Sequence, residues 1–256
     1  MTQQSISIPR ADVGHTTAYL IGAFVLSWIP WSIAASLGAA DARTALVFLG
    51  GFGPMVAAIA VTARTGGRPA VRELLGKYKH RRGSGRAYLM APVILLAAAL
   101  TAAGSLLTGA TLDTGALLAV LPALPVMIVM IALVGGGNEE LGWRGFLSPR
   151  LRSALPPAAA HLTVGLIWAV WHAPLWLIPG TAQQTLPFAV FAVTAVAISI
   201  LLGWATQRAG GGILPAVLAH TALNVGLSLL QAALGDVPLV PLTALLLAAA
   251  LVVARK

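Results

Sequence analysis

The side chains best suited to chemistry stand in or beside long apolar runs of the sequence. They are Glu139, Glu140, Arg144, His161, His172 and His220, with Asn224 as a neutral companion. A charged group at the centre of a bilayer costs about 2.5–3.5 kcal/mol, so such groups usually face one another inside a bundle and mark a functional site. A carboxylate in apolar surroundings can take a proton from water, histidine can orient that water, and an asparagine amide can donate to an oxyanion. These residue types together indicate hydrolysis of an amide bond delivered from the membrane.

The spacing of these residues groups them on helix faces. Three pairs stand four residues apart, namely Glu140 with Arg144, Trp168 with His172, and His220 with Asn224. Residues at this spacing share one face of a helix, so three helices each present a polar face. Counted at about 1.5 Å per residue, Glu139, His172 and His220 lie about 12–16 Å inside the membrane and can meet at one level. The glycine run 135–137 leaves an alternative to this depth for Glu139, because it could end the fourth span and leave Glu139 on an interfacial helix.

A purely structural interpretation is favoured for some of these side chains. Glu140 and Arg144 have the spacing of an ion pair that locks one helix. His161 has no motif partner and is interpreted as interfacial. Glu139 has no comparable local partner, which favours a chemical role for it.

The two motif histidines also have structural alternatives. His172 could be a core histidine that bonds the carbonyl of residue 170, which Pro174 deprives of its helical partner. His220 and Asn224 could be polar contacts between helices, worth about 0.6 kcal/mol each. The chemical interpretation is favoured over both.

The composition identifies the environment that positions these groups. Of 256 residues, 58% are hydrophobic and 9% charged, whereas soluble domains have about a quarter charged. The net charge of +9 is confined to short segments between apolar runs, so we interpret it as an orientation signal and expect no nucleic acid partner. The absence of cysteine excludes disulfides, a thiolate nucleophile and Cys-ligated zinc. The expected partners are membrane lipids and a membrane-associated peptide or protein substrate.

About eight runs are long enough to cross roughly 30 Å of hydrocarbon. They cover residues 17–38, 45–63, 88–108, 116–134 (extending toward 147), 160–178, 186–206, 212–230 and 238–254. No soluble domain remains. We expect one integral membrane domain over residues 1–256, an all-α polytopic bundle whose motif-bearing core spans about 116–230.

The basic residues predict the orientation of the bundle. Eight of them lie between the second and third runs, in what we call the basic segment (residues 64–86): Arg64, Arg68, Arg72, Lys77, Lys79, Arg81, Arg82 and Arg86. This segment should form a cytoplasmic loop, with both termini on the same side, in the plasma (inner) membrane. It could also bind anionic lipid head groups. Arg43 is the basic residue left on the far side, and the site should open toward the cytoplasmic half.

The motifs resemble those of a known family. Residues 138–147 read Asn-Glu-Glu-Leu-Gly-Trp-Arg-Gly-Phe-Leu, and they are followed by Trp-x3-His at 168–172 and His-x3-Asn at 220–224. A Glu-Glu-x3-Arg motif followed by Phe-x3-His and His-x3-Asn motifs on separate spans is typical of the CPBP family. This family comprises CAAX proteases and bacteriocin-processing intramembrane proteases, with the Ras-converting enzyme as a eukaryotic relative. The chain resembles it over about residues 135–226, with Trp168 in place of the usual Phe.

The resemblance implies an intramembrane endopeptidase that processes a membrane-associated or lipidated substrate, of CAAX or bacteriocin type. Glu139 would then be the general base, and His172 would help to hold the water. His220 and Asn224 would be the oxyanion partners. Glu140 and Arg144 would fix the motif helix, and Trp168 would shape the pocket.

Two questions stay open at this point. Glu139, His172 and His220 could bind zinc with one position left for water, but the compact H-E-x-x-H pattern is absent, and a metal-free glutamate site is favoured. The alternative to an enzyme is a proton-coupled transporter, or a bacteriocin-immunity or scaffold factor, that uses the same buried Glu and His. Transporters often contain paired, interrupted half-helices from an internal repeat, and the sequence shows no such repeat.

Overall fold

The computed structural model describes residues 10–79 and 83–255, and within these ranges the chain is helical with no β-strand. Seven helices of this part are long and apolar enough to cross a membrane: Val13–Ser36, Ala40–Gly76, Gly85–Leu107, Thr114–Arg152, Pro157–Leu177, Phe188–Arg208 and Leu214–Leu234. An eighth apolar helix, Leu239–Ala254, has 16 residues and is shorter than these. The predicted all-α polytopic membrane bundle is therefore confirmed.

The spans are built from the following elements. The first half contains α1 (Arg10–Ser36), α2 (Ala40–Gly51), α3 (Gly53–Gly76), η1 (Gly85–Leu89), α4 (Met90–Leu107), α5 (Thr114–Val120), η2 (Leu121–Ala123) and α6 (Leu124–Val134). The second half contains α7 (Gly137–Glu140), η3 (Leu141–Leu147), α8 (Ser148–Arg152), α9 (Pro157–Trp171), η4 (Ala173–Leu177), η5 (Ala182–Thr185), α10 (Phe188–Arg208), α11 (Leu214–Leu234) and α12 (Leu239–Ala254).

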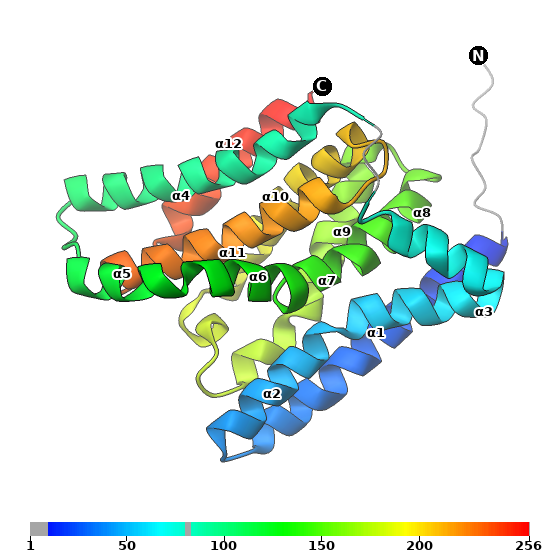
Figure 1. Ribbon diagram of the computed structural model, residues 1–256, viewed down its shortest axis with the longest axis horizontal. Helices are drawn as coiled ribbons and strands as arrows, with labels where there is room; N and C mark the ends of the chain where they lie inside the picture. The colour runs from blue at the N-terminus through cyan, green and yellow to red at the C-terminus, as the bar shows by residue number, and fades with distance from the viewer. Residues whose placement is uncertain (1–9, 80–82, 256) are drawn as a thin grey trace.

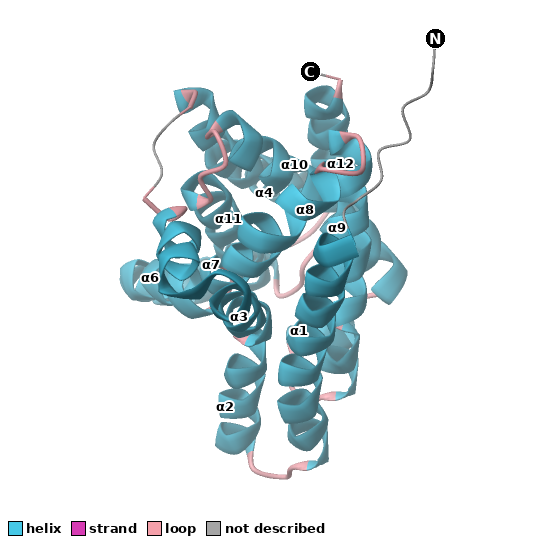
Figure 2. Ribbon diagram, turned by 90° about the vertical axis from the view of Figure 1, so that its right-hand side faces the viewer, coloured by secondary structure: helices cyan, strands magenta, loops and turns pink. Residues whose placement is uncertain are grey.

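The helices pack in two groups (Figures 1 and 2). α4, α10, α11 and α12 lie side by side, and α9 packs along α10. α1 packs against both α2 and α3 as a second group. Large apolar side chains such as Leu118, Val126 and Leu133 remain exposed on the bundle surface, as expected of helices that face lipid and satisfy their backbone groups internally.

The basic segment is mostly helix, and the prediction of a loop there is wrong. α3 continues to Gly76 and carries Arg64, Arg68 and Arg72. It kinks at Gly67, where φ is +64°. Arg81 and Arg82 lie outside the described residues. The charge pattern did not predict this extension because an arginine-rich helix end and a basic loop have similar composition.

The fourth run is interrupted before the motif. α6 ends at Val134, the chain bends at Gly135 and Gly136, and α7 starts at Gly137. A Cβ atom on Gly137 would lie 1.6 Å from the carbonyl oxygen of Ala132, and one on Gly136 would lie 3.0 Å from the His220 ring. The glycines therefore allow a close approach that places the motif against α11.

The connections divide between two ends of the bundle. The loops at 37–39 and 178–187 lie at one end, where Val47 and Ile178 line a common cavity. At the other end, the Ile213 amide donates to the Lys77 carbonyl and the Ser84 amide donates to the Arg208 carbonyl. We call the latter the basic end, because the basic segment leads into it.

Candidate active site

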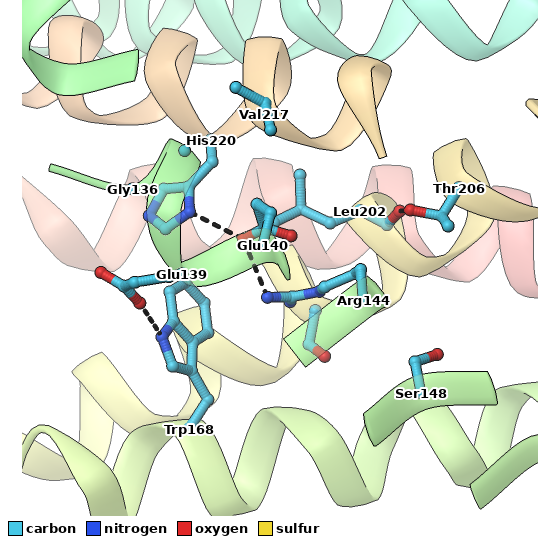
Figure 3. A network of polar contacts seen from close by, with 12 residues as sticks. Gly136, Glu139, Glu140, Arg144, Ser148, Trp168, Leu202, Thr206, Val217 and His220 are labelled. Carbon is cyan, nitrogen blue, oxygen red and sulfur yellow. Dashed lines mark hydrogen bonds and ion pairs between the residues drawn. The ribbon is translucent and has the colours of Figure 1, made fainter. Parts of the chain in front are cut away.

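Glu140 joins two helices at the centre of the site. Its Oε1 accepts hydrogen bonds from Arg144 Nη1 at 3.0 Å and from His220 Nδ1 at 2.9 Å (Figure 3). Glu140 is 0% exposed and Arg144 1%. The expected pair within one helix is therefore present, but it also reaches His220 on α11. A buried charge without partners would cost several kcal/mol, and here each charge has an opposite one in contact.

Glu139 is held by a contact to α9. Its Oε2 accepts a hydrogen bond from Trp168 Nε1 at 2.7 Å, and the residue is 7% exposed (Figure 3). The Trp168 ring also lies 5.0 Å from the Arg144 guanidinium carbon. Trp168 therefore connects both halves of the Glu-Glu-x3-Arg motif to the helix that carries His172.

The two motif histidines flank the same tryptophan. The ring centroids of His172 and His220 lie 5.3 and 5.2 Å from that of Trp168, both edge-to-face. His172 Nδ1 donates to the Trp168 carbonyl at 2.8 Å. This partner differs from the residue 170 carbonyl of the structural alternative. Because a carbonyl can only accept, this bond leaves His172 Nε2 as an acceptor.

Asn224 ties α11 to the interrupted fourth span. Its Nδ2 donates to the Gly135 carbonyl at 2.5 Å, which satisfies a carbonyl that the end of α6 would otherwise leave unpaired. An amide nitrogen carries two hydrogens, so one more donor remains.

A cavity of about 270 Å³ brings the predicted residues together. Glu139, Trp168, His172, His220 and Asn224 all line it, whereas Glu140 and Arg144 form the buried support beside it. The cavity continues past Phe48, Gln183 and Leu186, toward the end of the bundle opposite the basic end. The expectation that the site opens on the side of the basic segment is therefore not met.

The zinc alternative requires three side chains that are close enough to bind one ion. Among the described residues, no three His, Asp or Glu side chains are grouped so that they could hold a metal ion together. Glu140 and the Trp168 carbonyl occupy the Nδ1 atoms of His220 and His172. Nε2 is therefore the nitrogen that each of these rings has left for another partner.

Three supporting residues escaped the sequence prediction. Asn138 Nδ2 donates to the Gly51 carbonyl at 2.9 Å, Tyr78 Oη donates to the Gly137 carbonyl at 3.0 Å, and Lys77 Nζ donates to the Gly145 carbonyl at 2.5 Å. Burial raises the pKa of Tyr78 to about 12, and burial together with nearby Arg150 lowers the pKa of Lys77. Asn138 adjoins the two glutamates in the sequence, whereas Lys77 gave no signal beyond its charge and Tyr78 gave none.

Residues 121–226 match the family described as Type II CAAX prenyl endopeptidase Rce1-like. This segment contains every residue of the three motifs. Residues 121–226 are therefore similar to the family that the three motifs resemble. The chain is also 26% identical over 111 residues to CAAX prenyl protease 2 of Methanococcus maripaludis. That alignment covers 41% of this chain and 41% of the relative, so the CPBP similarity spans about two fifths of each protein.

Proposed function

We propose that this protein is an intramembrane endopeptidase that cleaves a peptide bond of a membrane-associated or lipidated peptide. The observation that carries the proposal is that Glu139, His172, His220 and Asn224 line one common, largely apolar cavity. The match to CAAX endopeptidases supports the reaction class. Surrounding lipids and a membrane-tethered substrate are the partners that this site requires.

In the proposed reaction, Glu139 takes a proton from a water molecule, and the water oxygen attacks the carbonyl carbon of the scissile bond. His172 Nε2 accepts from the same water and orients it. The carbonyl oxygen becomes an oxyanion, to which the second Asn224 amide hydrogen and His220 donate. Glu139 then returns the proton to the leaving amine, which gives one new carboxylate and one new amine.

Glu140 supports this chemistry indirectly. Its contact with His220 Nδ1 orients the imidazole and stabilises positive charge on it when Nε2 also carries a proton. Arg144 compensates the remaining negative charge of Glu140. We propose that the reaction needs no metal ion, because no three His, Asp or Glu side chains of the described residues are grouped as a metal-binding set.

The decisive experiment replaces Glu139 with Gln in purified, detergent-solubilised protein and measures cleavage of membrane-tethered peptides. We expect a loss of at least about a thousandfold in kcat, since a general base and its positioned water are both removed. Glu73→Gln, at an exposed carboxylate on α3, is the matched control. Cleavage retained by Glu139→Gln contradicts the proposed base, and a folded wild type inert toward a broad peptide library favours a transporter or immunity factor.

The metal question has its own measurement. Wild-type protein treated with a strong chelator and shown by elemental analysis to be free of zinc should retain full activity. Activity that disappears on chelation and returns with zinc contradicts the metal-free mechanism.

We also propose that the protein lies in the plasma (inner) membrane with its basic end facing the cytoplasm, because cytoplasmic segments of membrane proteins carry an excess of Lys and Arg. The charges on α3 and after it support this orientation, and they would lie close to anionic head groups.

A further inference from the structure

A separate cavity lies at the basic end, between α9, α10 and α12. It has a volume of about 280 Å³ and is lined by the first turn of α9, the last turns of α10 and the end of α12. We call it the interfacial groove. Its α10 residues are Ile200, Trp204, Gln207 and Arg208, which share one face of that helix. None of its lining residues belongs to the cavity that holds Glu139.

The face of α10 that lines the groove continues into the membrane as an apolar stripe. Val193, Val196 and Ile200 follow on this face at intervals of three and four residues, and each is at least partly exposed. Apolar side chains exposed on a membrane span face lipid tails. The eight residues from Arg208 to Ile200 span about 12 Å. An acyl chain whose head lies in the groove therefore has an apolar surface to lie on.

Arg208 gives the groove its positive charge. Its guanidinium carbon lies 5.2 Å from the centroid of the Trp204 ring. Within the described residues both ion pairs involve Glu140, and no Asp or Glu of this part of the chain lines the groove. A half-buried guanidinium that no carboxylate neutralises suits two-point binding of a phosphate.

The first turn of α9 adds backbone donors. The helix begins at Pro157, and no side chain caps it at Pro156. Amides at the start of a helix have no partner within it, and the helix dipole places partial positive charge there. Ala158 is exposed and lines the groove. The start of α9 and Arg208 therefore act on the same space, and both favour an anion.

The inner wall of the groove is held by side chains that bond to one another. His161 lines it and is 4% exposed. Gln207 Nε2 donates to His161 Nε2, which leaves the ring proton on Nδ1, and Nδ1 faces Ser148 Oγ at 3.5 Å. Both ring nitrogens are thus engaged, so contacts to an anion come from Arg208 and α9.

We propose that the interfacial groove binds one anionic phospholipid, with its phosphate against Arg208 and the first turn of α9. One acyl chain then follows the stripe from Ile200 to Val193. A net negative head group fits better than a zwitterionic one, because no described carboxylate lines the groove to pair with an ammonium. Arg208 also covers the Trp204 ring, which a choline group would otherwise use. Tryptophan at head-group depth is common in membrane proteins.

The test is native mass spectrometry of purified, delipidated protein in a neutral detergent with phosphatidylglycerol, phosphatidylcholine or diacylglycerol of identical acyl chains. One phosphatidylglycerol should bind per protein, about fivefold more tightly than phosphatidylcholine and at least about tenfold more tightly than diacylglycerol. Equal binding of phosphatidylglycerol and diacylglycerol overturns the proposal. Displacement by sodium phosphate, at ionic strength held constant with sodium chloride, identifies a free anion as the ligand and overturns it as well.

Arg208→Gln removes the charge and keeps a polar side chain. It should lower the affinity for phosphatidylglycerol about tenfold and bring the ratio to phosphatidylcholine close to one. Arg72→Gln, at an exposed position on α3, removes one basic charge of the same membrane side and is the matched control. It should retain the wild-type affinity and ratio. A preference that survives in Arg208→Gln, or an equal loss in both variants, overturns the proposal.

A third variant tests the place of the acyl chain. Ile200→Trp fills the apolar part of the groove, and thermal unfolding checks that the variant is folded. It should lose phosphatidylglycerol binding, and unchanged binding by the folded variant contradicts the proposed path of the chain. None of these measurements contains a peptide, so their outcome does not depend on the proposed endopeptidase function.

Discussion

At the residue scale, Trp168 donates a hydrogen bond that a Phe, the usual residue at this motif position, could not donate. Its ring packs against both histidines, as any large aromatic ring could, but its Nε1–H also donates to Glu139. One oxygen of the carboxylate is thereby fixed, and the other stays free for water. The sequence indicated only a change of pocket shape, because a hydrogen bond between separate helices leaves no trace in spacing.

We predict that Trp168→Phe lowers kcat about tenfold and leaves KM nearly unchanged. The substitution keeps an aromatic ring and removes one bond to a charged group, whose contribution is about 1.5–3 kcal/mol. Steady-state kinetics with one tethered peptide measure both constants. An unchanged kcat would mean that the bond does not position Glu139.

Glu140 governs stability at the same scale, because its carboxylate takes part in both ion pairs of the described residues, with Arg144 and with His220. Glu140→Ala should lower the free energy of unfolding by about 3–5 kcal/mol, since it leaves the Arg144 charge buried without compensation. Chemical unfolding in mixed micelles measures this loss. Glu73→Ala, at an exposed position, should change stability by less than about 0.5 kcal/mol. A similar, small effect at both positions would contradict the buried-pair argument.

At the element scale, spacing correctly grouped residues within each helix but could not predict the contacts between helices. The pairing of Glu140 with Arg144 follows from their separation of four residues. The bond from Glu140 to His220 spans 80 residues, and it depends on how closely α7 approaches α11. The sequence indicated that the Gly135–Gly137 run could interrupt the span. That these glycines let the motif helix approach α11 closely can be seen only in the three-dimensional structure.

Tyr78 shows how the end of α3 supports the motif helix. Its hydroxyl donates to the Gly137 carbonyl, and its pKa is raised from 10.0 to about 12 by burial and by the charge of Glu140. The folded state therefore holds this proton more tightly than the unfolded state does. The resulting stabilisation is complete below about pH 10 and is lost as the pH rises toward 12.

We predict that Tyr78→Phe is less stable than wild type by about 1–2 kcal/mol at pH 8, and that this difference shrinks between pH 10 and 12. Comparing the two proteins cancels the titration of groups that they share. Thermal unfolding midpoints across this pH range provide the measurement. A difference that stays constant with pH would show that Tyr78 does not titrate as described.

At the scale of the whole molecule, hydropathy was sufficient to predict a multi-pass helical bundle, because lipid requires long apolar helices. Hydropathy was insufficient to predict how long each helix is and where a helix is interrupted. The run expected at 45–63 became two helices, α2 and α3, of which the second extends to Gly76. The direction in which the cavity opens also depends on packing and could not be predicted from composition.

The orientation of the molecule can be tested cleanly because the chain contains no cysteine. Single cysteines at the exposed positions Gly38 and Gln184 should react with a membrane-impermeant thiol reagent added outside intact cells. Cysteines at the exposed positions Lys79 and Ser153 should react only after the membrane is opened. The reverse pattern would place the basic end outside and the loops at 37–39 and 178–187 in the cytoplasm.

The π-helical winding of η3, Leu141–Leu147, has a consequence for sequence length in this region. A π segment accommodates more residues per turn than an α-helix, and such bulges occur often at functional sites. Deleting Gly145 would let the remaining six residues take ordinary α winding, which turns the chain about as far as seven residues of π winding and so keeps the downstream residues in register with the two glutamates. A one-residue insertion has no such compensation and would rotate everything downstream by about 100°. Surrounding loops should therefore tolerate insertions that this turn cannot.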